Sequence, residues 1–285
     1  LLHAYEALRP MNVPLEKIKT VMNDTKLAPD TGITAASRSH YFAGLATLDA
    51  AKKLMSAMRK SDGTYRTYDE MVAEGIPTKY EGVAASRPGL NNYDVNRGEG
   101  DAWPEVMYTI FMSEVEVDTE TGKTKVLRMT LVGDVGVIGN YLGVEGQAYG
   151  GLCHSLGFAL KTDFSDMKKH STMVGAGITE IEDMPDDIEL IWNQTYREHG
   201  PHGSAGCAEA FQCSGHVSIL NAIHDAVGVR IFDLPATPEK VKALMEAKAQ
   251  GNECKPEKYY LGPDLYEEMD YIEKNPRYWD FETAE

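Results

Sequence analysis

The sequence lacks several features that would assign it to a familiar functional class. No uninterrupted apolar run approaches the roughly 20 residues that cross a bilayer, and we find no signal-peptide pattern. No block of basic residues occurs and the formal net charge is −16, so we expect neither nucleic acid nor an anionic membrane surface as a partner. The P-loop motif GxxxxGK[ST] is also absent, which argues against that kind of nucleotide site.

Cysteine is scarce, and its spacing argues against the common metal centres. The four cysteines are Cys153, Cys207, Cys213 and Cys254. Their spacings fit no zinc or iron–sulfur motif, and no pair of histidines is placed to complete such a site. We therefore expect free thiols in a reducing compartment, which favours a cytoplasmic location and leaves the periplasm open.

The rest of the composition is typical of a soluble globular protein, with 42% apolar and 25% charged residues. Its 285 residues suit one large domain or two modest ones. Strands and helices are mixed with few βαβ alternations, which predicts an α+β fold of mixed sheets and packed helices. Residues 1–251 are expected to form this part, as one domain or two subdomains. Residues 252–285 hold ten acidic and seven aromatic side chains, and we interpret them as an extended C-terminal arm lying on another protein surface.

Apolar periodicity predicts the order of the elements. Helices are expected over residues 1–8, 41–59, 140–161, 208–227 and 238–249, with a small helix within 60–89. A long β-hairpin is expected over 105–136, and strands over 16–24, 188–196 and 229–234. The glycines within 140–161 weaken an isolated helix, so we expect that helix to pack tightly against a neighbour. Because the first residues already follow a helical pattern, we expect a piece of a longer protein or one subunit of a split assembly.

The stretch REHGPHGSAGCAEAFQCSG, residues 197–215, places three glycines ahead of one acid. Gly200, Gly203 and Gly206 permit positive φ and close backbone approach, and a helix that follows such a loop presents free N–H groups. Glu209 falls in the first turn of the predicted helix. Two interpretations are open: the acid complements the helix dipole, which the pattern alone favours, or it is a general base beside a cofactor.

Several further segments resemble a known family in the same order along the chain. These are YEALRPMNVPLEKIK, TYDEMVAEGIPTK, FMSEVEVDTETGKT, EGQAYGGLCHSLGFAL, DFSDMKKHSTMVGAG and LPATPEKV. Together with the glycine-rich stretch, they resemble the C-terminal, molybdopterin-binding portion of the molybdenum hydroxylases, the xanthine oxidase and aldehyde oxidoreductase family, over residues 1–249. The resemblance is strongest to bacterial aldehyde oxidoreductases that carry molybdopterin cytosine dinucleotide.

The resemblance implies a catalytic role for Glu209. In the family, the acid of the glycine-rich motif takes a proton from a hydroxyl on molybdenum, whose oxygen attacks the substrate while hydride passes to a sulfido ligand. A metal-bound hydroxyl is a far stronger acid than bulk water, so a carboxylate can serve as its base. The resemblance also implies that molybdenum is held through the pterin dithiolene, with no direct ligand from this chain.

The resemblance further implies a cradle for the cofactor. The family loop Ser-Gly-Gly-Ser-Arg-Gln, which holds the pyranopterin dinucleotide, matches Thr34, Ala35, Ala36, Ser37, Arg38 and Ser39. Arg38 suits the pyrophosphate charge, Gln147 matches a glutamine that hydrogen-bonds the pterin, and Asn140 lies where a second polar contact is expected. Ala208, next to the base, completes the implied contacts. From the residues alone, a surface ion pair for Arg38 and an exposed helix position for Gln147 are favoured.

The chain departs from the family pattern at several of these positions. Ala35 and Ala36 replace glycines, and their methyl groups could crowd the cofactor. Cys207-Ala208 stands where Val-Gly is usual, and His202 replaces an apolar residue, facing either the pocket or solvent. We interpret the glycines as clearance for the cofactor, and Arg197 and His199 as structural residues that orient the loop.

The activity implied by the resemblance is oxidation of an aldehyde to a carboxylic acid with oxygen from water. Two alternatives are kept: the same chemistry on a purine or another N-heterocycle, and a non-catalytic structural subunit. The family's iron–sulfur, flavin and upstream molybdenum-domain segments do not occur in this sequence. We therefore expect as partners the remaining molybdenum-domain sequence and a [2Fe-2S] domain or subunit, with or without FAD, within an oligomer.

Overall fold

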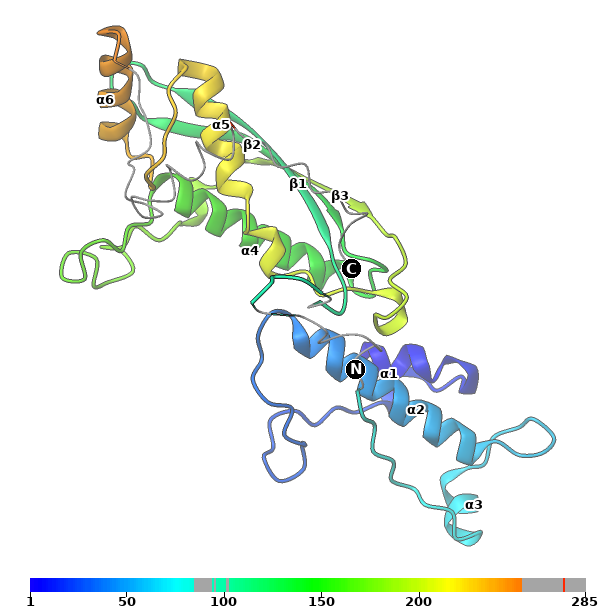
Figure 1. Cartoon of the computed structure of the whole chain (residues 1–285). Coiled ribbons are helices and arrows are strands. Elements are labelled where there is room, and N and C mark those ends of the chain that lie inside the picture. Colours follow the sequence, from blue (N-terminus) through cyan, green and yellow to red (C-terminus); the bar gives the residue numbers. More distant parts are fainter. Residues whose placement is uncertain (85–93, 95, 101–102, 253–273, 275–285) are drawn as a thin grey trace.

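The computed structural model describes residues 1–84, 94, 96–100, 103–252 and 274, and its elements fall into two groups (Figure 1). The helical group, residues 1–84, contains α1 (Leu2–Ala7), α2 (Gly44–Met58) and α3 (Tyr68–Ala73). The sheet group, residues 103–252, contains strands β1 to β3 and helices α4 to α6. The fold is α+β, as predicted. No helix in the described ranges is long and apolar enough to cross a membrane.

The predicted hairpin is confirmed, and it forms two of the three strands of the sheet. β1 (Tyr108–Val117) and β2 (Thr124–Asp134) run antiparallel, and β3 (Asp187–Asn193) pairs with β2 in parallel, which gives the order β1-β2-β3. The chain between β2 and β3 contains α4 (Tyr141–Leu160), the kind of crossover that parallel strands require.

The core lies between one face of the sheet and the helices α4 and α5 (Gly215–Val227), which cross it in Figure 1. Burial alternates along β1, as expected for a strand with one buried face. Burying a large apolar side chain stabilises the fold by about 1.5–3 kcal/mol. Core residues that are at most 2% exposed include Met129, Leu131, Leu152, Leu156, Phe211, Ile219 and Ile223.

The glycines of α4 show where this helix packs closely. A Cβ atom added to Gly151 would lie 2.6 Å from the backbone and Cβ of Phe211, and one added to Gly157 would lie 2.5 Å from Thr179 Oγ1. Tight packing is therefore confirmed at these two positions. Gly150 differs, because a Cβ there would meet no atom within 4 Å among the described residues.

Two predicted strands are wrong. Residues 16–24 contain the 3-10 turn Leu15–Lys17 followed by irregular backbone, and residues 229–234 are irregular as well. Both segments have strand-like composition, but neither pairs with a strand within the described chain, and strand propensity has little force without a neighbour. The segment 229–234 instead connects α5 to α6 (Pro238–Ala249) and buries Val229.

The predicted helix over 208–227 is broken into two parts. Glu209–Phe211 forms a separate 3-10 turn, and α5 begins only at Gly215. Both parts lie against α4: Phe211 packs against Gly151, and a Cβ on Gly215 would lie 2.5 Å from Ser155 Oγ.

The other predicted helices are confirmed as α1, α2, α3, α4 and α6. α2 is preceded by the π-helical turn Ser39–Ala43, and α6 starts with Pro238 at its first position behind a Thr237 cap. The proposed arm over 252–285 lies outside the described residues, apart from residues 252 and 274.

Candidate functional site

The glycine-rich loop, residues 197–209, is fixed to the end of β2. The amide of Ala205 donates to the carbonyl of Val135 at 2.9 Å, and the amide of Val137 donates to the carbonyl of Gly203 at 2.9 Å. These two bonds extend the backbone pairing beyond the end of β2, so the middle of the loop has a rigid support.

Arg197 anchors the beginning of this loop from a buried position. Its side chain is 7% exposed, pairs with Asp134 Oδ1 at 3.0 Å and donates to the carbonyls of Val106, Thr195 and Asp134. Burial raises the pKa of Asp134, but hydrogen bonds from Thr195 and Gly136 and the charge of Arg197 outweigh burial and lower that pKa. These contacts support the structural interpretation of Arg197, and the His199 amide likewise bonds Glu105 at 2.8 Å.

The three glycines are required by the chain's own packing. A Cβ on Gly200 would overlap the carbonyl of Ser204, and a Cβ on Gly203, where φ is +81°, would overlap the ring of Tyr196. A Cβ on Gly206 would overlap the Cβ of Ser37. The interpretation of these glycines as clearance for a cofactor is therefore replaced by clearance for neighbouring protein.

The contact at Gly206 brings the two predicted halves of the site together. Ser37 lies in the segment 34–40, which consists of the predicted cofactor loop, residues 34–39, and the following His40. It touches the glycine-rich loop three residues before Glu209. A second link joins the same segments, because His40 Nε2 lies 2.7 Å from Ser204 Oγ. Residues more than 160 positions apart in sequence thus meet at one place.

The segment 34–40 is a strained, polar turn. Ala36 and Ser37 have φ of 49° and 56°, in the left-handed region that side chains other than glycine rarely adopt. Ala36 is one of the two alanines that replace glycine in the family pattern. The hydroxyl groups of Thr34 and Ser39 are hydrogen-bonded to each other at 3.1 Å, which closes the turn.

Backbone carbonyls hold one side of the Arg38 guanidinium group. Its Nη1 donates to the carbonyls of Thr31 and Ile33 at 2.6 and 2.8 Å, and the group lies over the ring of Phe42. Within the described chain no hydrogen bond or ion pair uses its Nε or Nη2. These two donors form the planar fork that recognises phosphate.

Glu209 is exposed at the surface and belongs to the 3-10 turn rather than to a long helix. Two positions along, Phe211 is fully buried against Trp192 and Gly151, which anchors the turn. The neighbouring Cys207 is no candidate nucleophile, because burial raises the pKa of its thiol to about 11.

Gln147 and Asn140 lie near the start of α4 and differ in what holds them. Asn140 caps the helix, its Oδ1 accepting from the amide of Gly143 at 3.1 Å. Gln147 is exposed, and its side chain makes no hydrogen bond to any described residue. Beside it, Cβ atoms added to Gly146 and Gly150 would meet no atom of the described residues within 4 Å. The helix surface at these two glycines is therefore accessible to a planar ligand.

The structure also shows residues that sequence reasoning missed. His3, His40 and Ser204 connect the segment 34–40, α1 and the glycine-rich loop. Neither their spacing nor their identity forms a motif, so only the folded chain brings them together.

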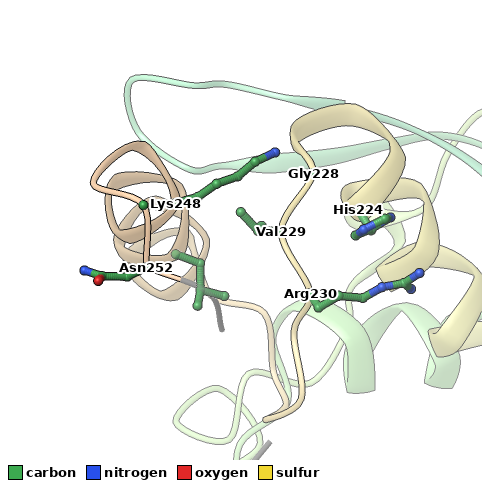
Figure 2. Close-up of a pocket in the computed structure, with 8 residues that line it drawn as sticks. His224, Gly228, Val229, Arg230, Lys248 and Asn252 are labelled. Carbon is green, nitrogen blue, oxygen red and sulfur yellow. The ribbon is translucent and has the colours of Figure 1, made fainter. Parts of the chain in front are cut away.

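A pocket of about 360 Å³ lies elsewhere, between the ends of α5 and α6 (Figure 2). Its cations are engaged: Lys248 Nζ donates to the carbonyl of Val227 at 3.1 Å, and Arg230 donates to Asn221 Oδ1 at 3.0 Å. It lies at the opposite end of α5 from Glu209, a helix of 13 residues and so about 20 Å long. It is therefore separate from the candidate site.

Comparison with known proteins agrees with this architecture. Residues 3–185 match the family model of the molybdopterin cofactor-binding domain. The aldehyde oxidoreductase of Megalodesulfovibrio gigas is 43% identical over 244 residues, which are 86% of this chain and 27% of that protein. A solved structure of aldehyde oxidoreductase from Desulfovibrio gigas superposes with a TM-score of 0.83 over 86% of this chain and 27% of its own, and a rice xanthine dehydrogenase is 27% identical over 84% of this chain and 19% of its own.

The fold and the site thus define a portion of a molybdopterin cofactor-binding domain. The chain belongs to the molybdenum hydroxylases of the xanthine oxidase family. It spans about a quarter of the length of the aldehyde oxidoreductase that it matches.

Proposed function

We propose that this chain supplies the catalytic base and part of the cofactor cradle of a molybdenum hydroxylase that oxidises an aldehyde to a carboxylic acid. The observation that carries the proposal is the contact of Gly206 with Ser37, which joins the loop of Glu209 to the segment 34–40. The 43% identity to an aldehyde oxidoreductase, against 27% to a xanthine dehydrogenase, favours an aldehyde over an N-heterocycle as substrate.

The residues present fit a pterin dinucleotide cofactor. The open fork of Arg38 suits a pyrophosphate, and the hydroxyls of the segment 34–40 can bond the same group. The exposed amide of Gln147 has both a donor and an acceptor to offer a pterin edge, beside the open backbone of Gly146 and Gly150. The capping role of Asn140 occupies its Oδ1 and leaves its Nδ2 for a ligand. We propose the cytosine dinucleotide form of the cofactor, as the resemblance implies.

In this mechanism the bound cofactor supplies the two-electron oxidation and activates water. Glu209 accepts, at a carboxylate oxygen, the proton that the activated water gives up when its oxygen is transferred to the substrate carbon. The rigid support of the loop on β2 and the buried Phe211 limit the motion of this carboxylate. The [2Fe-2S] centres, with or without FAD, that would accept the electrons are expected on other parts of the enzyme.

The test is Glu209→Gln in the complete enzyme, with Glu198→Gln as the matched control. Glu198 is an exposed acid of the same loop with no described hydrogen bond. We expect Glu209→Gln to lower kcat for an aldehyde about 10²- to 10⁴-fold at unchanged molybdenum content, while the control keeps native kinetics. A near-native rate in Glu209→Gln would show that another group is the base.

Cofactor analysis of the same enzyme tests the cradle. We expect about one molybdenum per copy of this chain, and release of cytidine monophosphate on hydrolysis of the extracted cofactor. Arg38→Lys keeps one positive charge but loses the planar fork, so its cofactor content is expected to fall several-fold. Native enzyme without molybdenum would favour the structural-subunit alternative instead.

A further inference from the structure

Three histidine rings meet where the helical group touches the glycine-rich loop. His3 comes from α1, His40 from the π-helical turn before α2, and His202 from the glycine-rich loop. The ring centroids of His3 and His40 are 4.9 Å apart, and those of His3 and His202 are 5.6 Å apart with nearly parallel planes. Among the described residues no arrangement of three His, Cys, Asp or Glu side chains suits a metal ion, so the cluster calls for another explanation.

The hydrogen bonds of the cluster run between the two groups of elements. Ser204 is 6% exposed, and its hydroxyl donates to the carbonyl of Pro201 at 2.5 Å. Since that hydroxyl has one proton, it accepts from His40, whose Nε2 therefore carries hydrogen. His202 Nε2 lies 3.2 Å from the carbonyl of His3. A carbonyl oxygen can only accept, so this nitrogen is the donor. A neutral ring satisfies each of these contacts.

The charges around the cluster disfavour a protonated ring. Burial, then the charges of His40, His202 and the amino group of Leu1, lower the pKa of His3 to about 4. Burial and the charge of His202 likewise lower the pKa of His40. No carboxylate is among the groups that act on either ring.

The charged side chains of the packed segments have other partners. Arg38 donates to the carbonyls of Thr31 and Ile33, and the carboxylate of Asp134 pairs with Arg197. No carboxylate therefore compensates a proton placed on His3 or His40.

We propose that His40 and His202 are positioning residues that join the segment 34–40 and α1 to the glycine-rich loop and so fix the direction of Glu209. The latch, defined as His3, His40, His202 and Ser204, holds the two segments through which the cradle and the base are supplied. Its link to catalysis rests on the proposed function, whereas its mechanical role does not.

The first test separates the hydrogen bond of His40 from its shape. In the complete enzyme, His40→Gln places an amide N–H near the position of Nε2, and His40→Phe keeps the ring shape without the donor. We expect His40→Gln to retain kcat within about threefold, and His40→Phe to lower kcat about 10- to 100-fold with KM changed less than twofold, because small misplacement of a catalytic group is costly. Equal effects of the two variants would overturn the proposal.

A double-variant comparison keeps this result specific to the latch. Ser204→Ala removes the acceptor, so it should lower kcat as His40→Phe does, and the two changes together should cost no more than about twofold beyond the larger one. Fully multiplicative effects would contradict a shared hydrogen bond. Molybdenum content, measured in each variant, shows whether the cofactor is retained.

The second test does not depend on activity. Amide hydrogen exchange, corrected for intrinsic rates, should show the protection of Gly203 and Ser204 falling about tenfold between pH 7.5 and 5. Burial lowers the pKa of His3 and His40 in the closed latch, so the opened form binds protons more readily and gains population as the pH falls. The amides of Met129 and Leu131 in β2 are the internal reference and should not change. The triple variant His3→Gln, His40→Gln, His202→Gln should lose this pH dependence. Constant protection in the native enzyme would overturn the latch even if Glu209 is the base. If the native enzyme shows this pH dependence while Glu209→Gln remains active, the proposed function alone is overturned.

Discussion

The sheet group and the helical group differ in how they bury apolar surface. The continuous core consists of residues between 126 and 241, all within the sheet group. In the helical group the buried apolar side chains are few and separate, namely Tyr41, Ala51 and Met71. Its exposed large apolar side chains, at least half accessible, include Leu1, Val21, Met22, Leu27, Ile33, Tyr68, Val72 and Val83.

This difference indicates a division of roles. The sheet group can hold its own fold, because its helices and sheet share one interior. The helical group presents the segment 34–40 to the glycine-rich loop, and its exposed apolar side chains are typical of a contact surface for further protein. We therefore expect changes in the sheet group to alter stability most, and changes in the helical group to alter mainly the site.

The largest effect is expected from Leu152→Ala. Leu152 is fully buried in α4, and such a truncation leaves a cavity that costs about 3–5 kcal/mol. Ala51→Gly in α2 is the counterpart in the helical group, and it should cost only about 1 kcal/mol, mainly through helix propensity. Urea unfolding followed by the fluorescence of Trp192, with Trp103 and Trp279 replaced by Phe, measures the first variant, and amide exchange within α2 measures the second. An equal loss in the two variants would contradict the difference between the groups.

A neighbouring pair of glycines gives opposite expectations on one helix. Gly151→Ala would place a Cβ 2.6 Å from Phe211 and should cost about 1–3 kcal/mol. Gly150→Ala meets nothing within 4 Å and should instead stabilise α4 by about 0.5–1 kcal/mol. The same unfolding measurement distinguishes them. If both variants lose stability equally, α4 does not pack on the Phe211 turn as described.

The parts of the fold that sequence predicted are those set by local signals. The hairpin followed from alternating apolar residues and a Thr121-Gly122 turn, and α6 followed from periodicity with a Thr cap and Pro238. The segments 16–24 and 229–234 have strand propensity, but neither has a neighbouring strand among the described residues, and no local pattern can supply one.

The sequence motifs indicated candidate site residues one by one, but they did not indicate how the chain brings these residues together. The motifs indicated Glu209, Arg38 and Gln147, and their roles stay predictions. The contact of Ser37 with Gly206 and the bond of His40 to Ser204 depend on the path of the whole chain. Sequence spacing likewise could not show that the glycines are filled by protein, since that depends on Tyr196 and Ser37 folding over them.

Helix caps of the same chemistry allow a smaller comparison between the groups. Asn140 caps α4, and Thr67 forms a capping box with Glu70 at the start of α3. Replacing either by Ala should cost the local helix about 1 kcal/mol. We expect the Trp192 unfolding transition to shift for Asn140→Ala and to stay unchanged for Thr67→Ala, whose effect should appear as faster amide exchange within α3. A shift of the Trp192 transition by Thr67→Ala would show that the two groups unfold together.

The smallest effect concerns the strained turn that carries the proposed cofactor contacts. Ala36 has φ of 49°, and the left-handed region costs a non-glycine residue about 1–2 kcal/mol, part of which glycine loses again through its greater freedom when unfolded. Ala36→Gly should therefore stabilise the turn by about 0.5 kcal/mol. Ala35 has no positive φ, so Ala35→Gly should destabilise the turn by a similar amount. Amide exchange of Arg38, whose N–H donates to the carbonyl of Ala35 at 2.9 Å, measures both variants at the same bond. We expect slower exchange of the Arg38 amide in Ala36→Gly and faster exchange in Ala35→Gly. A change in the same direction in both variants would contradict the left-handed conformation of Ala36.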